Sequence, residues 1–135
     1  MFHAGQATEA FSRLEQLIKA HPKSARLRFL KGVLLTDSAR PGEAQSIFLQ
    51  LTADYPELPE PYNNLAVLYA SQGDYDRARA ALEAALRASP GYAVAHQNLG
   101  DVYVQLARQS YTEAQRLDPS LTVPKIPSTA PGGTP

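Results

Sequence analysis

Three prolines recur along the chain at one fixed interval: Pro22, Pro56 and Pro90. Each follows an alanine by twelve residues, and these alanines are Ala10, Ala44 and Ala78. A fixed period in the range of about 20–50 residues is typical of proteins in which each unit packs on its neighbours instead of around one central core. The 135-residue chain is therefore expected to fold as a short array of repeats.

The unit from residue 59 to residue 92 has the clearest internal pattern. Its apolar and small residues are spaced by three and four, which is the period of one helix face; they are Tyr62, Leu65, Ala66 and Tyr69, then Tyr75, Ala78, Leu82, Ala85 and Leu86. Gly73-Asp74 interrupts this pattern and Ser89-Pro90-Gly91 ends it. The unit is predicted to be helix, short turn, helix, in an all-α fold.

These positions resemble the tetratricopeptide repeat (TPR). The matching residues are Tyr62, Leu65-Ala66, Tyr69, Gly73, Ala78, Leu82, Ala85 and Pro90. Residues 25–58 match the same pattern at Gly32, Leu35, Ala44, Phe48 and Pro56, with Lys31 where leucine is usual and residues 39–42 in place of the usual turn. Gly5 falls at the turn position of an earlier unit, so residues 6–20 are expected to form a second helix whose first helix is missing.

The resemblance implies a solenoid of helical hairpins with about three repeats. We expect a TPR domain over residues 1–119, comprising a half repeat (5–22), two full repeats (25–58 and 59–92) and a shortened repeat (93–119). Residues 120–135 are rich in proline and glycine and are expected to form a tail. Within it, residues 122–127 carry the apolar side chains and are expected to contact protein surface, whereas residues 130–135 are not.

The shortened repeat lacks its turn. His96, Leu99-Gly100 and Tyr103 fall at the first-helix positions of the family, and Ala107, Tyr111 and Ala114 at its second-helix positions. Three residues separate Tyr103 from Ala107 where the family has eight, and Val102 to Leu117 contains no Gly, Pro, Asn or Asp. One continuous helix is therefore predicted from about Tyr92 to Leu117, roughly 40 Å long at 1.5 Å per residue.

A fused helix cannot cover its own apolar side chains. Leu106, Tyr111, Ala114 and Leu117 would form an exposed stripe, which monomeric proteins seldom tolerate. We therefore expect a homodimer in which two copies exchange these segments, with an interface of Leu99, Tyr103, Leu106, Tyr111, Ala114 and Leu117. The alternative is a kink near Gln105 that keeps the hairpin closed within one chain.

Composition and motifs argue against several classes of function. The formal net charge is zero, which disfavours nucleic acid and anionic membrane surfaces as partners. No apolar run approaches the roughly 20 residues of a membrane span, and no signal peptide is visible. The chain has no cysteine and no metal or phosphate-binding motif, so no metal, cofactor or enzymatic activity is expected. His96 is expected to be a partly buried packing residue.

The TPR resemblance implies that the first helices line a concave groove that binds segments of partner proteins. The groove residues are predicted to be Phe29, Val33, Asn63, Asn64, Val67, Gln97, Asn98 and Asp101. Apolar side chains flanked by amides suit a peptide whose backbone needs hydrogen bonds; Asn64 and Asn98 would bond that backbone or, alternatively, local carbonyls. Chaperone-binding TPRs clamp a terminal carboxylate with positions that here hold Phe29 and Val33, so apolar or neutral segments are expected.

The functional prediction is a non-catalytic protein–protein interaction scaffold. The alternative is a self-assembly module, in which homo-oligomerisation through the exchanged helix is the main role. A third interpretation is that the chain is a fragment of a longer repeat protein. The sequence generally resembles bacterial TPR proteins, and both the periplasm and the cytoplasm remain open as its compartment.

Overall fold

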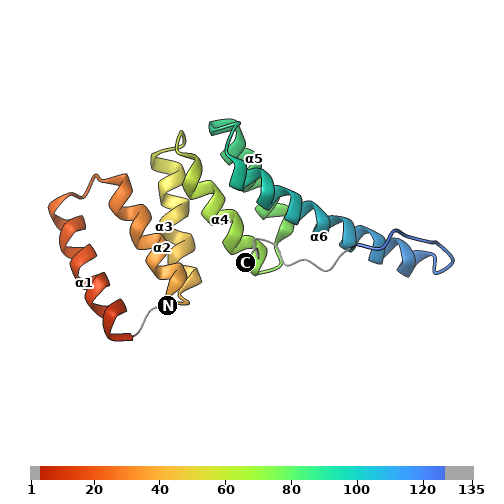
Figure 1. Ribbon diagram of the computed structural model, residues 1–135, viewed down its shortest axis with the longest axis horizontal. Helices are drawn as coiled ribbons and strands as arrows, with labels where there is room; N and C mark the ends of the chain where they lie inside the picture. Colours follow the sequence, from red (N-terminus) through yellow and green to blue (C-terminus); the bar gives the residue numbers. More distant parts are fainter. Residues whose placement is uncertain (1–3, 127–135) are drawn as a thin grey trace.

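The computed structural model describes residues 4–126, and within them it contains six α-helices and no strand. The helices are α1 (Ala4–Ala20), α2 (Ala25–Asp37), α3 (Pro41–Asp54), α4 (Pro59–Ser71), α5 (Tyr75–Ala88) and α6 (Ala93–Leu117). They pack in chain order, α2 with α3 and α4 with α5 as hairpins, so the molecule is elongated (Figure 1). The predicted all-α solenoid of helical hairpins is confirmed.

Local sequence signals explain where most helices begin. The Ser24 hydroxyl accepts a hydrogen bond from the backbone N–H of Leu27 (3.3 Å), and Asp74 caps α5 in the same way through Arg77 (3.2 Å). Helices α3 and α4 each begin with a proline, whose missing N–H would have had no partner at the first helical position. These signals fix the hairpins in register along the array.

The turns within the two complete hairpins use different residues at the position with positive φ. The turn between α4 and α5 uses Gly73 at φ +76°, a backbone conformation that costs glycine little. The turn between α2 and α3 places Ala39 at φ +57°, where a Cβ is unfavourable. The helix predicted over residues 6–20 is present as α1, which begins at Ala4, so that Gly5 is helical.

The core runs along the array between paired helices. Three second-helix positions are fully buried in both complete repeats; they are Ala44, Phe48 and Leu51, then Ala78, Leu82 and Ala85. Helix α2 approaches α3 closely at Gly32, where a Cβ would lie 2.6 Å from the ring of Phe48. The next repeat has the smaller Leu82 in the place of Phe48 and accommodates Ala66 in the place of Gly32.

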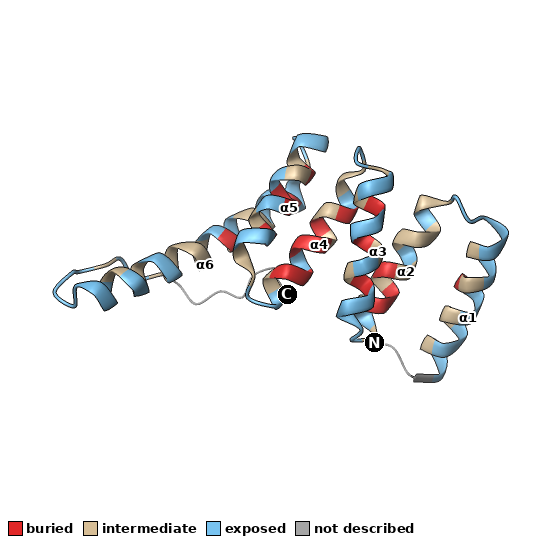
Figure 2. Ribbon diagram, turned by 180° about the vertical axis from the view of Figure 1, so that it is seen from behind, coloured by how far each residue is buried: buried red, intermediate tan, exposed pale blue. Residues whose placement is uncertain are grey.

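Helix α6 has 25 residues and continues through Gln105 without folding back, so the hairpin of the last repeat does not form. Its first half packs against α5, where Ala95 and Val102 are buried. Its second half projects away from the other helices and is coloured mostly as exposed or half-buried (Figure 2). Because the turn is missing, the last repeat consists of one long helix whose C-terminal half extends beyond the other helices.

The segment after α6 turns back toward the body of the molecule (Figure 1). The Gln115 side chain donates to the carbonyl of Leu121 (3.2 Å) at this turn. Val123 and Ile126 are half-buried, and the other residues from 121 to 125 are exposed. Pro127 and residues 130–135, to which part of the tail prediction refers, lie outside the described residues.

Candidate functional site

A hollow between α2 and α4 includes one of the predicted groove residues, Phe29. It has a volume of about 360 Å³ and is lined by Ala25, Arg26, Phe29, Leu51, Leu58, Glu60 and Pro61. Arg26 and Glu60 occupy the same register position in successive first helices, since one repeat period separates them. The other lining residues are apolar, so this α2–α4 hollow can accept an apolar side chain between one cationic and one anionic group.

Phe29 is both part of this hollow and part of the core. Its ring lies 5.7 Å from the ring of Phe48 at an interplanar angle of 58°, a favourable tilted arrangement. The side chain is half-buried and packs against the main core cluster. The floor of the hollow is therefore rigid, because its main aromatic group is held by the packing that joins α2 to α3.

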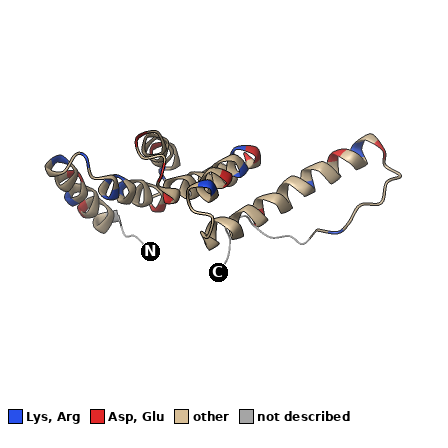
Figure 3. Ribbon diagram, turned by 90° about the horizontal axis from the view of Figure 1, so that it is seen from above, with Lys and Arg blue, Asp and Glu red and all other residues tan. Residues whose placement is uncertain are grey.

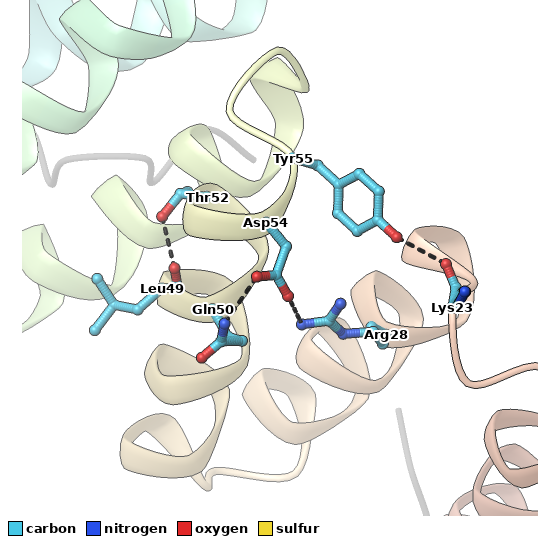
Figure 4. A network of polar contacts seen from close by, with 7 residues as sticks. All are labelled: Lys23, Arg28, Leu49, Gln50, Thr52, Asp54 and Tyr55. Atoms are coloured by element: carbon cyan, nitrogen blue, oxygen red, sulfur yellow. Dashed lines mark hydrogen bonds and ion pairs between the residues drawn. The ribbon is translucent and has the colours of Figure 1, made fainter.

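A polar network fixes the start of α2 against the end of α3 (Figure 4). Arg28 donates to the Asp54 carboxylate (2.8 Å), which also accepts from Gln50 (2.9 Å), and the Tyr55 hydroxyl donates to the carbonyl of Lys23 (2.8 Å). The hydrogen bond from Arg28 is the main reason that the pKa of Asp54 is lowered from its ordinary value. The network joins the N-terminal part of α2, which carries Arg26 and Phe29, to the end of α3.

Two predicted groove amides are hydrogen-bonded to each other. The Asn98 side chain of α6 donates to the side-chain oxygen of Asn63 on α4 (3.0 Å), and Asn63 is buried. Asn64, the other proposed backbone donor, is half-buried. The Asn63–Asn98 bond crosses from one repeat to the next, so these amides help to fix the spacing of the first helices.

The remaining predicted groove residues are spread along the first helices. Val67 on α4 is exposed, as are Gln97 and Val94 on α6, whereas Asp101 is half-buried. Val33 lies in a second apolar hollow, between α1 and α2, that also includes Leu14, Leu17, Leu30 and Leu34. These leucines were not predicted; Leu30 occupies the register position of Asn64 and Asn98 and could have been found by that alignment.

The predicted oligomer interface is divided between two faces of α6. Leu99 and Leu106 pack against the chain's own core, together with buried Val102. Tyr103 is 48% exposed, Tyr111 and Ala114 are half-buried, and Leu117 is exposed. The prediction for His96 is wrong: the residue is exposed, and its ring nitrogen Nε2 is hydrogen-bonded to the carbonyl of Pro90 (2.9 Å). The second helix that would have covered it is absent from this repeat.

Within residues 4–126, no three His, Cys, Asp or Glu side chains gather in a way that could hold a metal ion. The carboxyl groups with lowered pKa values, Asp54, Glu113 and Asp118, are all exposed, and hydrogen bonds from neighbouring side chains are the main cause of each shift.

Surface charge and helix hydropathy give further bounds on the described part of the chain. Charged side chains of both signs are interspersed over the helices (Figure 3), in keeping with a formal net charge of zero. None of the helices in residues 4–126 combines the length and the apolar character that spanning a bilayer requires.

Comparison with known proteins agrees with this geometry. Two family models, each described as tetratricopeptide repeat, match residues 1–68 and residues 59–92. Two crystal structures of MamA superpose with TM-scores of 0.68, at 21% and 19% identity, covering 85% and 90% of this chain and 70% and 72% of theirs. A structure of Naa15/Naa10 bound to HypK-THB gives a TM-score of 0.66 at 19% identity, covering 86% of this chain and 18% of that one. At these identities the solved structures establish the fold alone.

Proposed function

Since the chain belongs to the tetratricopeptide repeat family, we propose that it is a non-catalytic scaffold whose first-helix groove binds a peptide segment of a partner protein. The family and the fold are those of protein-interaction scaffolds, which are generally not enzymes. The finer proposal concerns which surface binds and what it accepts. The proposed groove consists of Phe29, Val33, Asn63, Asn64, Val67, Gln97, Asn98 and Asp101.

The observation that carries this proposal is the α2–α4 hollow. It opens between two successive first helices and its walls are mostly apolar, with Phe29 as the aromatic group. Binding energy at such surfaces concentrates in a few side chains that enter apolar pockets. A volume of about 360 Å³ is large enough for one bulky apolar side chain of a bound segment.

The chemistry around the hollow favours a neutral or apolar segment. Arg26 and Glu60 carry opposite charges at its rim, so neither an acidic nor a basic segment is attracted overall. Exposed Val67 and Val94 continue the apolar surface along α4 and α6. Gln97 is exposed on α6, and its amide can exchange hydrogen bonds with the backbone of a peptide.

The proposal can be tested with a displayed library of random short peptides selected on the purified chain. Val67→Asp is the preferred groove variant because Val67 is 38% exposed, so the substitution leaves the core intact. Leu49→Asp is the matched control, since Leu49 is 43% exposed but lies on the second helix α3. Phe29→Ala is less informative by itself, because it also removes the contact with Phe48.

We expect the selected peptides to share one bulky apolar residue in a neutral context. Val67→Asp should weaken their binding at least 10-fold, measured by fluorescence anisotropy, and Leu49→Asp should leave it unchanged. Equal affinity for both variants, or selection of acidic C-terminal peptides, would refute the groove proposal.

Self-association is the second candidate function. It is favoured by the second half of α6, which projects away from the other helices of residues 4–126 (Figure 3). In this case the chain is a homodimer that exchanges its C-terminal helical segments, and the groove is not the main functional surface. Light scattering on the purified chain measures its oligomeric state. Because a dimer could also bind a peptide in its groove, this measurement distinguishes the two candidate functions only when it is combined with the peptide binding of the groove variants.

A further inference from the structure

Helix α6 carries two different apolar faces. One contains Ala95, Leu99, Val102 and Leu106 and packs against the body of the chain. The other is rotated by roughly 100° to 120° around the helix at 3.6 residues per turn; it contains Gly100, Tyr103, Ala107, Tyr111 and Ala114 and is called the open face. The first face packs against the core of its own chain, whereas the members of the open face are exposed or half-buried.

The complete repeats indicate what should cover the open face. Gly100 lies two repeat periods after Gly32, where the absence of a Cβ leaves room for the ring of Phe48. At Gly100 an added Cβ would meet no atom within 4 Å. The glycine that permits close approach of a second helix is present, but the second helix is not.

The missing helix is present in the sequence of α6 itself. Ala107, Tyr111 and Ala114 stand at the positions of Ala44, Phe48 and Leu51, which are fully buried in the first full repeat. In α6 none of the three is buried. They lie on the same face of one continuous helix as Gly100, with Tyr111 roughly 16 Å further along the axis, so they cannot fold back to cover it.

We infer that a second copy of this chain covers the open face, with Tyr111 of each copy seated on Gly100 of the other. The inference rests on self-association, the second candidate function, and does not involve the groove. The occupant is a second copy because α6 contains both halves of the contact, so one twofold axis satisfies both chains at once. The midpoint between residues 100 and 111 places that axis between Gln105 and Leu106.

The antiparallel arrangement is compatible with the rest of the molecule. The other five helices lie at the N-terminal end of α6, and its C-terminal half extends beyond them (Figures 1 and 3). Two antiparallel α6 helices would therefore place the two bodies at opposite ends of the pair. The segment that turns back after Leu117 is a competing occupant of the open face, and the experiment distinguishes it because it would leave the chain monomeric.

The first test introduces a large side chain at Gly100, where Tyr111 of the second copy would pack, without disturbing the fold. Gly100→Phe adds a ring where the single chain has open space, and Thr112→Phe is the control at an exposed α6 position outside the open face. Sedimentation equilibrium at 1–200 µM should give a dimer for the unaltered chain and for Thr112→Phe, and at least a 10-fold weaker dimer for Gly100→Phe. Circular dichroism should show equal helix content for all three. A monomeric unaltered chain, or a dimer insensitive to Gly100→Phe, overturns the inference.

The second test reads the register of the pair. The chain contains no cysteine, so a single introduced thiol can be oxidised without competition. Ala107→Cys lies near the predicted axis on the open face, whereas Thr112→Cys lies about 140° further around the helix. The Ala107→Cys chain should form a covalent dimer on oxidation and the Thr112→Cys chain should not, since a disulfide requires Cβ atoms about 3.5–4.5 Å apart. The reverse result contradicts the proposed pairing. Gly100→Phe does not alter the proposed groove residues, so this variant should bind the selected peptides as the unaltered chain does. A loss of dimer without a loss of peptide binding therefore tests the pairing independently of the groove.

Discussion

The contact between Gly32 and Phe48 makes a quantitative prediction about how the hairpins pack. In Gly32→Ala the new Cβ would lie 2.6 and 2.7 Å from two ring carbons of Phe48. The ring cannot move away easily, because Phe48 is fully buried and Phe29 packs on it at 5.7 Å. Overpacking costs about 1–3 kcal/mol, and we take the upper end. Alanine recovers about 1 kcal/mol of helix propensity, so the net loss of stability should be about 2 kcal/mol.

The next repeat contains the compensating pair. There Ala66 stands in the place of Gly32 and Leu82 in the place of Phe48, and both are buried. Phe48→Leu alone should cost about 1–2 kcal/mol through lost packing. In Gly32→Ala/Phe48→Leu the clash disappears while the helix propensity is retained, so the double variant should be about as stable as Phe48→Leu or slightly more so. The coupling energy between the two sites should be about 2–3 kcal/mol, near the upper limit usually found for residues in contact.

Urea denaturation followed by far-UV circular dichroism measures these four free energies of unfolding, at one protein concentration for all variants. Arrays of repeats can unfold in steps, so amide hydrogen exchange in α2 and α3 should be measured alongside. If the two substitutions are additive within about 0.5 kcal/mol, the close approach of α2 to α3 at Gly32 does not limit the packing and the reasoning is refuted.

Two further predictions concern the turn before α3 and the network at its end. Ala39→Gly should stabilise the chain by about 1 kcal/mol in the same urea experiment, because Ala39 has φ +57°; a loss of stability would contradict the assigned turn. Arg28→Met should raise the pKa of Asp54 in an NMR titration, since Arg28 is the main cause of its lowered value. A lowered folded-state pKa contributes stability that is present above the unfolded-state pKa and is lost as the pH falls through the folded-state pKa. Arg28→Met should therefore reduce the loss of stability on acidification below about pH 4; an unchanged titration of Asp54 would show that the ion pair has no effect in solution.

The repeats and the fused helix could be predicted from the sequence because they depend on local signals. The repeat period is visible in the regular spacing of the prolines. Gly73 marks a turn, and the helix-forming residues after Val102 favour a continuous helix, each through the conformation of its own backbone. The continuous α6 followed from the absence of any turn residue, and the structure contains it as Ala93–Leu117. Gly5 aligns with the turn position of the repeat but is helical, because glycine permits a turn and does not require one.

The functional surfaces were harder to predict because periodicity does not identify the neighbour that covers a helix face. Leu106 was assigned to the exposed stripe of α6, yet it packs against the core while Tyr103 is exposed. His96 was expected to be partly buried, which requires a second helix that this repeat does not form. The Asn63–Asn98 hydrogen bond joins residues 35 apart in neighbouring repeats, and sequence spacing alone did not distinguish it from a bond to the backbone.

The missing turn of the last repeat is the central element of this account, and restoring it gives the most direct test. The five residues Gln-Gly-Asp-Tyr-Asp, copied from positions 72–76, are inserted between Gln105 and Leu106. The insertion should allow Tyr111 to fold back onto Gly100 of its own chain. Light scattering at high micromolar concentration should then give twice the single-chain mass of 14.7 kDa for the unaltered protein, and the mass of one chain for the insertion variant. The same number of chains per particle in the two proteins, whether both are monomeric or both dimeric, would contradict the account.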